Sequence, residues 1–441
     1  MTEALTATPA LVDLLQRIEA RTAVVGVVGL GHVGLPVATS MLDAGFAVIG
    51  FDIDREVVER WSDRAPGDGA AASDERRTVR WQASTDLSLL SEADAILLCV
   101  PTPLGEDDQP DLSHVEAAAA AVAGRLRPGQ LVVLESTTWP GTTREVLLPR
   151  LERTGLTSGV EIFVAYSPAR VDPGRTEPGP GDIPRLVGGV DAASGEAATR
   201  LYAAALAHVV PVSSAEVAEA AKLLENVYRA VNIALVNEMK LVLGAMGIDV
   251  HEVIDAAATK PFGFQPFRPG PGWGGHCIPI DPFYLAWKAD QSGTQARFVE
   301  LAGRINRAMP DHVITKLREA LAERGTELSG ARVLVVGLAY KPDIADVRES
   351  PSLQLIGRLL AAGAQADYHD PHVPAMEASR SPALPSMGSV PLDESSLRGY
   401  DAVLIATDHR SVDYDLIGRS AKLVVDTRGV MRGREGTVIQ A

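Results

Sequence analysis

The sequence contains very little cysteine: two residues, Cys99 and Cys277, in a chain of 441. Two cysteines are too few for a disulfide scaffold or a four-cysteine zinc site. No apolar run approaches the roughly 18 residues that a membrane span requires, and the amino-terminal residues lack the apolar segment of a signal peptide. We therefore expect a cytoplasmic protein with reduced thiols, no membrane contact and no bound metal.

Positive charge is also scarce, since 41 lysines and arginines stand against 57 aspartates and glutamates, for a formal net charge of -16. A nucleic-acid binder usually presents a basic surface to the phosphates, so we do not expect this class of protein. A hydrophobic content of 46% with 22% charged residues is typical of a globular protein. The length is sufficient for two or three domains.

Alternating apolar runs and helical segments predict the fold of the first part of the chain. Residues 24–52 have the pattern of a strand, a glycine turn, a helix and a strand, and the apolar runs in 94–104 and 130–143 flank another helical segment. Such a β-α-β pattern is typical of a Rossmann-like parallel sheet. We place this domain at residues 1–212, with polar surface loops at 61–77 and 171–182.

The periodicity changes at residue 213. A long helical stretch without proline begins there, with Ser213 and Glu216 in the spacing of a capping box, and helical segments continue to about Met309. Residues 310–441 return to strands and a glycine turn. The expected fold class is therefore α/β: two Rossmann-like doubly wound domains, 1–212 and 310–441, joined by a helical middle, 213–309, with one long central helix.

The first glycine turn, "GLGHVG", has the spacing of a dinucleotide-binding site at Gly29, Gly31 and Gly34. The glycines allow a tight turn and the approach of a pyrophosphate to a helix N-terminus. Asp52 ends the next strand, where a carboxylate binds ribose hydroxyls and repels a 2′-phosphate, so NAD is favoured over NADP. The alternatives are that Asp54 takes the ribose role, or that the turn binds nothing.

Polar residues follow the next two apolar runs, in "CVPTPL" and "ESTTWPGTT". Ligands bind at the carboxyl ends of strands in open parallel sheets, so we expect Pro101, Thr102, Ser136 and Thr137 to face the nicotinamide half of the cofactor. Alternatively, the hydroxyls only cap the following helices. Cys99 lies within an apolar strand and is expected in the core.

On the long helix, Lys222 and Asn226 lie four residues apart and hence on one face. A lysine and an amide so placed can stabilise an oxyanion. An ordinary solvated lysine is the alternative.

The stretch "PGPGWGGHCIPIDP" holds Cys277 in a frame of glycines and prolines. Glycines such as Gly272 and Gly274 let the backbone pack closely around a ligand, and the prolines stiffen the loop. A thiolate held there is a nucleophile, which His276, Lys222 or a helix N-terminus could activate, and Asp281 could accept protons or hold water. A buried structural cysteine is the alternative, whereas metal binding by adjacent His276 and Cys277 is not favoured.

The last domain carries cations in two strand-end loops. Lys341 and Arg348 lie in "GLAYKPDIADVRESPS", and Arg428 lies in "VVDTRG". Cations in such loops suit a diphosphate. A surface charge cluster is the alternative.

In order along the chain, "GLGHVGLP", "VPTPL", "ESTTWPGTT", "KLLENVYRAVNIALVNE", "PGPGWGGHCIPIDP" and "GLAYKPDIADVRESPS" resemble the nucleotide-sugar 6-dehydrogenase family of UDP-glucose and UDP-N-acetylhexosamine dehydrogenases. The chain is most similar to the UDP-N-acetylglucosamine branch. The resemblance implies two NAD-dependent hydride transfers at C6 of a UDP-sugar, from alcohol through aldehyde to acid. It also implies a homodimer built on the long central helix.

The resemblance also assigns roles to residues. Cys277 forms a thiohemiacetal and then a thioester, Lys222 and Asn226 stabilise oxyanions, and Asp281 and Thr137 assist with protons and water. Substrate would meet Lys341, Arg428, Arg268, Gly272 and Gly274, and Arg348 would meet the NAD pyrophosphate.

One departure from the family stands at Ala169, in "SPAR" where the branch has Ser-Pro-Glu-Arg. The family glutamate serves proton transfer during thioester hydrolysis, which alanine cannot do. Asp281 with ordered water could substitute, or the reaction could stop after two electrons at the aldehyde. A third possibility is a protein that binds UDP-sugar and NAD without turnover.

Overall fold

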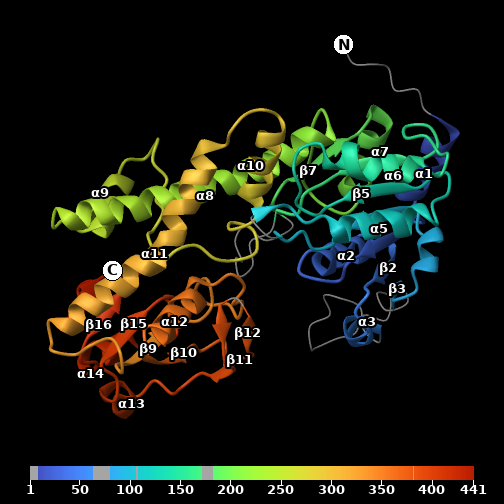
Figure 1. The fold of residues 1–441 in the computed structure, drawn as a ribbon. Coiled ribbons are helices and arrows are strands. Elements are labelled where there is room, and N and C mark those ends of the chain that lie inside the picture. The colour runs from blue at the N-terminus through green and yellow to red at the C-terminus, as the bar shows by residue number, and fades with distance from the viewer. Residues whose placement is uncertain (1–7, 63–79, 106–107, 171–181, 381) are drawn as a thin grey trace. The chain divides into compact units, whose positions relative to one another are not determined.

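The computed structural model describes residues 8–62, 80–105, 108–170, 182–380 and 382–441 (Figure 1). The predicted loop segments 61–77 and 171–182 lie largely outside these residues. The chain forms two compact units, Met1–Glu225 with Trp287–Gly293, and Asn226–Ala286 with Thr294–Ala441.

The first unit is built on an eight-stranded sheet in the order β3-β2-β1-β4-β5-β6-β7-β8. The order of its first six strands is that of a dinucleotide-binding Rossmann sheet. All neighbours pair in parallel except β6 and β7, which are antiparallel. Its strands are β1 (Val24–Val28), β2 (Ala47–Phe51), β3 (Trp81–Ser84), β4 (Ala95–Leu98), β5 (Leu131–Leu134), β6 (Phe163–Tyr166), β7 (Arg185–Gly189) and β8 (Val209–Pro211).

Three helices cover one face of this sheet. Apolar side chains of α1 (Pro9–Glu19), α2 (Gly34–Asp43) and α7 (Ala192–Ala203) form one buried cluster with alternate residues of β1, β4, β5 and β6. Cys99 belongs to this cluster, as expected. The remaining helical segments of the unit are α3 (Arg55–Ser62), η1 (Leu87–Ser91), α5 (Ser113–Ala123), η3 (Thr143–Leu147) and α6 (Leu148–Glu152).

The expected long helix is α8 (Ala215–Ala245), and its start differs from the prediction. The hydroxyl of Ser214, not Ser213, accepts a hydrogen bond from the Val217 backbone N–H. Glu216 pairs with Arg144. The capping-box prediction was therefore wrong by one residue: only Ser213 has a glutamate three residues later, but the helix begins after Ser214, for which that position is Val217. The unit boundary lies within α8.

The second unit contains a parallel sheet in the order β10-β9-β15-β16-β17. Its strands are β9 (Arg332–Val336), β10 (Gln365–His369), β15 (Ala402–Ile405), β16 (Val424–Asp426) and β17 (Val438–Gln440). Two short antiparallel pairs flank it: β11 (Ala375–Met376) with β14 (Met387–Gly388), and β12 (Ser379–Arg380) with β13 (Ala383–Leu384). A second Rossmann-like sheet is thus confirmed.

Helices cover both faces of this second sheet. Apolar residues of α11 (Arg297–Ala322) and α12 (Pro351–Ala361) pack on one face, and those of α13 (Glu394–Arg398) and α14 (Tyr414–Ser420) pack on the other. The remaining helices are α9 (Val250–Ala258) and α10 (Asp281–Gln291), and residues 213–309 contain no strand.

The helical region does not stop at Met309 as expected. Helix α11 continues to Ala322, with Pro310 buried inside it. Proline usually ends a helical pattern, which is why the sequence suggested a break there. The division into three domains at residues 212 and 309 stays a prediction.

Candidate functional site

The turn between β1 and α2 has the geometry that a dinucleotide requires. Gly29 has a φ of 95°, and an added Cβ would lie 2.5 Å from the Cys99 carbonyl oxygen. At Gly34 a Cβ would lie 1.8 Å from the Gly29 carbonyl oxygen, whereas at Gly31 nothing lies within 4 Å. The first and third glycines are therefore required by close packing of the chain, and the second faces open space where a pyrophosphate can approach.

The carboxylate of Asp52 lies beside this turn. It accepts hydrogen bonds from the backbone N–H of Leu30 at 2.8 Å and of Asp54 at 3.0 Å. Asp54 instead accepts from the Glu56 N–H at 2.9 Å, at the start of α3. Because Asp54 serves its own helix and Asp52 contacts the glycine turn, the geometry favours Asp52 over Asp54 as the ribose ligand. These residues fit a bound NAD.

The strand-end residues lie at the edge where β4 and β5 finish. Ser136 is buried and donates to the Val100 carbonyl at 2.7 Å, so its hydroxyl joins these two strand ends and caps no helix. Thr102 is buried, Thr137 is half-buried and Pro101 is exposed.

Glu219 is a buried residue of this region that sequence reasoning missed. Its carboxylate accepts from the Gly141 N–H at 2.6 Å, from the Thr143 N–H at 2.8 Å and from the Thr143 hydroxyl at 2.7 Å. Burial raises the pKa of Glu219 to about 7, against the opposing effect of these hydrogen bonds. The sequence did indicate that Glu219 lies on the same face of the helix as Lys222, because the two residues are three apart on α8. Lys222 itself is 7% exposed, which does not fit the ordinary solvated lysine of the alternative reading.

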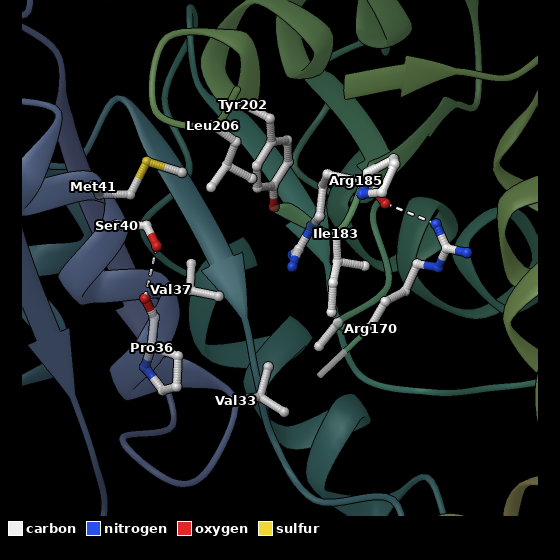
Figure 2. Close-up of a pocket in the computed structure, with 12 residues that line it drawn as sticks. Val33, Pro36, Val37, Ser40, Met41, Arg170, Ile183, Arg185, Tyr202 and Leu206 are labelled. Carbon is white, nitrogen blue, oxygen red and sulfur yellow. Dashed lines mark hydrogen bonds between the residues drawn. The ribbon is translucent and has the colours of Figure 1, made fainter. Parts of the chain in front are cut away.

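A cavity of about 70 Å³ lies between one face of α2 and the chain around Ala169. Figure 2 shows Val33, Pro36 and Val37 of the dinucleotide turn and helix on one side, with Arg170 and Arg185 opposite. Among the residues that the structure describes, its lining includes Ala169 and no carboxylate side chain.

A buried ion pair stands beside this cavity. Arg185, at the start of β7, pairs with Glu135, which follows β5. Arg185 also donates to the Ser167 hydroxyl at 2.8 Å, and the Tyr202 hydroxyl donates to Glu135 at 2.5 Å. Burial opposes the charge on Arg185, but the neighbouring Glu135 raises the pKa of the guanidinium overall.

In the second unit, Cys277 is exposed, which excludes the alternative of a buried structural cysteine. Its carbonyl accepts from the Asp281 N–H at 2.8 Å, so a turn joins the cysteine to the start of α10. Asp281 is 3% exposed, and its carboxylate accepts a hydrogen bond from the Asn226 amide at 2.5 Å. The structure thus brings Asn226 and Asp281 together beside the cysteine turn.

The glycines of the cysteine loop pack against protein. An added Cβ at Gly274 would lie 2.7 Å from the Tyr340 Cβ, and one at Gly275 would lie 2.8 Å from the Tyr340 ring. Gly272 has a φ of 129°, which favours glycine. These glycines let the loop approach the chain that follows β9, and this contact fixes the loop independently of any ligand.

Arg348 lies in this same contact. Its carbonyl accepts from the Gly275 N–H at 3.0 Å, and its guanidinium is paired with Asp346 at 2.6 Å. The hydrogen bond to Asp346 raises the pKa of Arg348 despite partial burial, and Cys277 is close enough to contribute. The Arg348 guanidinium and the Asp346 carboxylate thus form an ion pair in the segment that contacts the cysteine loop.

The other predicted substrate ligands lie in three places. Arg428 follows β16, is largely buried, and donates to the Ala406 carbonyl at 2.7 Å. Arg268 directly precedes the cysteine loop, is half-exposed, and pairs with Asp255 of α9 at 2.5 Å. Lys341 is partly buried after β9.

Among the described residues, one group could hold a metal ion: Asp343, His372 and His409. Both ring nitrogens of His409 are already engaged, since Nδ1 accepts from the Asp343 N–H at 3.0 Å and Nε2 lies 3.0 Å from Asp370. We therefore assign this group a structural role. No described helix is long and apolar enough to span a membrane.

Sequence comparisons identify relatives along almost the whole chain. Models of the UDP-glucose/GDP-mannose dehydrogenase family match its NAD binding domain at residues 23–206, its central domain at 216–308 and its UDP binding domain at 334–433. A UDP-N-acetyl-D-glucosamine 6-dehydrogenase of Pseudomonas aeruginosa is 35% identical over 87% of this chain and 90% of its own length. A UDP-N-acetyl-D-mannosamine dehydrogenase of Pyrococcus horikoshii is 34% identical over 92% and 96%.

Solved structures agree with the sequence relatives. The UDP-D-ManNAc dehydrogenase structure from Pyrococcus horikoshii covers 95% of this chain and 98% of its own, with a TM-score of 0.82 and 33% identity. A UDP-glucose dehydrogenase from Pyrobaculum islandicum covers 95% and 97%, with a TM-score of 0.81 and 29% identity.

Proposed function

Because the chain belongs to the UDP-glucose/GDP-mannose dehydrogenase family, we propose that it oxidises C6 of a UDP-sugar twice, from the alcohol to the acid. The substrate is of the UDP-N-acetylglucosamine or UDP-glucose type, with the former favoured by the sequence likeness. The observation that carries the proposal is the exposed Cys277 in a fixed turn, adjoined by the Asn226–Asp281 hydrogen bond.

Two oxidations at one carbon explain why a cysteine is needed. The first oxidation gives an aldehyde, and the Cys277 sulfur bonds to its carbon to form a thiohemiacetal. A second oxidation converts this adduct to a thioester, and water then breaks the carbon–sulfur bond, releasing the acid and the thiol. NAD accepts the hydride in each oxidation, and two molecules are reduced per sugar. Covalent capture prevents escape of the aldehyde between the two steps.

The proposed roles of the surrounding residues follow their chemistry. Asn226 donates to Asp281, so it holds that carboxylate in one orientation while Asp281 accepts protons or holds water. The ammonium group of Lys222 and the side-chain amide of Asn226 donate hydrogen bonds to the oxyanion of the tetrahedral adduct. Thr137 assists the proton transfers, as the family resemblance implies.

Lys341 and Arg428 are the proposed ligands of the UDP diphosphate, with Gly272 and Gly274 shaping the sugar site. Arg268 is also proposed to contact substrate, for which its ion pair with Asp255 must open or reorient. Arg348 is proposed to meet the NAD pyrophosphate, and its position beside Cys277 also suits it to stabilise the thiolate.

A second candidate is a two-electron reaction that stops at the 6-aldehyde. It is favoured by Ala169, which lies on the wall of a cavity whose described lining residues include no carboxylate. The two reactions differ in the amount of cofactor reduced: two NADH per sugar for the acid, and one for the aldehyde.

The test is to incubate the protein with NAD and UDP-N-acetylglucosamine, with UDP-glucose in parallel, and to follow NADH absorbance and product mass. We expect two NADH per sugar and complete loss of acid formation in Cys277→Ala. Cys99→Ala is the matched control, because Cys99 is buried in the core of the first unit. Unchanged turnover in Cys277→Ala contradicts the covalent mechanism. If the wild type shows no turnover and no mass adduct forms on Cys277, the protein only binds its ligands.

We also propose a homodimer through α8. Tyr228, Leu235 and Val242 recur every seven residues, and their exposed fractions are 49%, 50% and 40%. With Met246 at 66%, they form an apolar stripe on one face of the helix, which a second copy could cover. Light scattering after size-exclusion chromatography should show a dimer, and Leu235→Lys should shift it toward the monomer.

A further inference from the structure

One turn of α8 contacts both backbone polar groups of Gly270, its N–H and its C=O, at the N-terminal end of the cysteine loop. The Gly270 N–H donates to the Asn237 side-chain oxygen at 2.9 Å, and Lys240 Nζ lies 3.4 Å from the Gly270 carbonyl oxygen. Residues three apart on a helix lie on one face, so Asn237 and Lys240 contact the buried residue Gly270 from the same side.

The Asn237 amide has a fixed orientation. It is fully buried, and its NH₂ donates to the Asn306 side-chain oxygen at 2.7 Å. Asn306, on α11, in turn donates to the Ala302 carbonyl at 3.0 Å. A buried polar chain in which each member has a partner permits one arrangement, since rotating any amide leaves a buried donor or acceptor unpaired.

Gly270 packs against the candidate substrate arginine, and Lys240 has a second hydrogen-bond acceptor. Its Nζ donates to the Ala441 backbone oxygen at 2.6 Å, and an added Cβ on Gly270 would lie 2.6 Å from Arg428 Nη1. Gly270 therefore lies between the two cations, with no space for a side chain.

The charges that face Lys240 come from three elements. They are Arg428 and Asp426 at the end of β16, His312 on α11 and His251 on α9. Burial, and next Arg428, lower the pKa of Lys240 to about 7, and Asp426 acts in the opposite sense. A neutral lysine amine still donates to carbonyl oxygens, so both contacts persist above neutral pH.

The same helix also holds the far end of the loop. Asn226, three turns earlier on α8, donates to Asp281, and Asp281 is joined by its backbone N–H to the Cys277 carbonyl. Helix α8 thus fixes the chain before and after the cysteine.

We propose that Asn237 and Lys240 are positioning residues, which hold the root of the cysteine loop on α8 so that Cys277 is presented in one conformation in register with Arg428. The inference rests on the function proposed for Cys277. It adds to that function a set of residues that touch neither sulfur nor substrate but determine where the sulfur lies.

Hydrogen–deuterium exchange of the full chain, without ligands, tests the positioning directly. Lys240→Met keeps the length of the side chain and removes its donors, and Asn237→Ser removes the acceptor of the Gly270 N–H. We expect protection of peptides covering residues 270–277 to fall about tenfold or more in each variant, with the sheets of both units unchanged. Glu238→Gln, on an exposed residue of the same helical turn, is the control and should leave exchange unaltered.

Kinetics give the second readout. If the loop positions the thiol, kcat with NAD and UDP-N-acetylglucosamine should fall about 10- to 100-fold in Lys240→Met. The dissociation constant for NAD should stay close to that of the wild type. Lys240→Gln, which retains one donor, should recover part of the loss.

The proposal is overturned if exchange at residues 270–277 is unchanged in both variants. It is also overturned if protection falls evenly over the whole second unit. Exchange in the free protein does not depend on turnover. If the variants show faster exchange at 270–277 but the wild type has no activity, the proposed function is contradicted. The positioning of Gly270 by Asn237 and Lys240 is then still supported. If Asn237→Ser does not fold, Lys240→Met and Lys240→Gln decide the outcome.

Discussion

Removing the guanidinium of Arg185 should destabilise the first unit strongly. Glu135 is 1% exposed, and Arg185 is the cation paired with it. Arg185→Met keeps an unbranched apolar stem but removes the guanidinium, and so leaves the carboxylate buried without its counter-charge. Breaking a buried pair in this way costs about 3–5 kcal/mol. For a unit of this size the melting temperature should fall by about 6–20 °C.

A double-mutant cycle, in which both Arg185 and Glu135 are replaced, separates the effect of the lost charge from that of lost packing. When both partners of a buried pair become apolar, the change is often nearly neutral. Arg185→Met combined with Glu135→Met should therefore be more stable than Arg185→Met alone. Tyr202 and Ser167 each lose a partner in the double variant, so we expect partial recovery.

The assay is thermal and urea unfolding of the full chain, followed by circular dichroism and calorimetry, with the transitions of the two units resolved. Arg200→Met is the matched control, because Arg200 pairs with Glu196 on the exposed face of α7. An exposed pair of this kind contributes little to stability, because both charges are well solvated. A loss below about 1 kcal/mol in Arg185→Met, or strict additivity in the double variant, would falsify the assignment of Arg185 as the compensating charge.

Other substitutions give outcomes of different kinds. Gly34→Ala should cost the first unit more than about 3 kcal/mol, because the added Cβ would lie 1.8 Å from a backbone oxygen. Gly31→Ala meets nothing within 4 Å, so it should fold normally and raise the NAD dissociation constant by about tenfold in calorimetry. In the folded chain the pKa of Lys240 is about 7 rather than 10.5, so between these values the unfolded chain binds more protons. Wild-type stability relative to Lys240→Met should therefore rise with pH across that window in urea titrations, and a pH-independent difference contradicts the shift.

Most of the predictions that the structure confirmed concern residues close together in the sequence. The glycine spacing at 29, 31 and 34 predicted the turn, and the structure shows why the first and third positions exclude a side chain. The choice of Asp52 over Asp54 as ribose ligand, made from its place at the end of a strand, stays a prediction, which the hydrogen bond of Asp54 to its own helix supports. Such features depend on the backbone within one turn or one strand–turn–helix unit, so spacing alone specifies them.

Contacts between residues far apart in the chain could not be predicted from the sequence pattern. Nothing in the pattern around Glu219 indicates that it accepts from Gly141 and Thr143, and the serine that caps α8 was chosen wrongly. The antiparallel pairing of β6 and β7 was also missed, since an apolar run carries no record of the direction of its neighbour.

The sequence by itself determined the two Rossmann-like sheets, the dinucleotide turn, the long helix and the glycine-framed cysteine, because each depends on local backbone preferences and on apolar periodicity. Only the tertiary structure decided which buried polar groups pair: Arg185 with Glu135, and Gly270 with Asn237 and Lys240. Such pairs form where packing excludes water from groups far apart in the chain, and each buried donor or acceptor must then bond to whatever the fold has placed beside it.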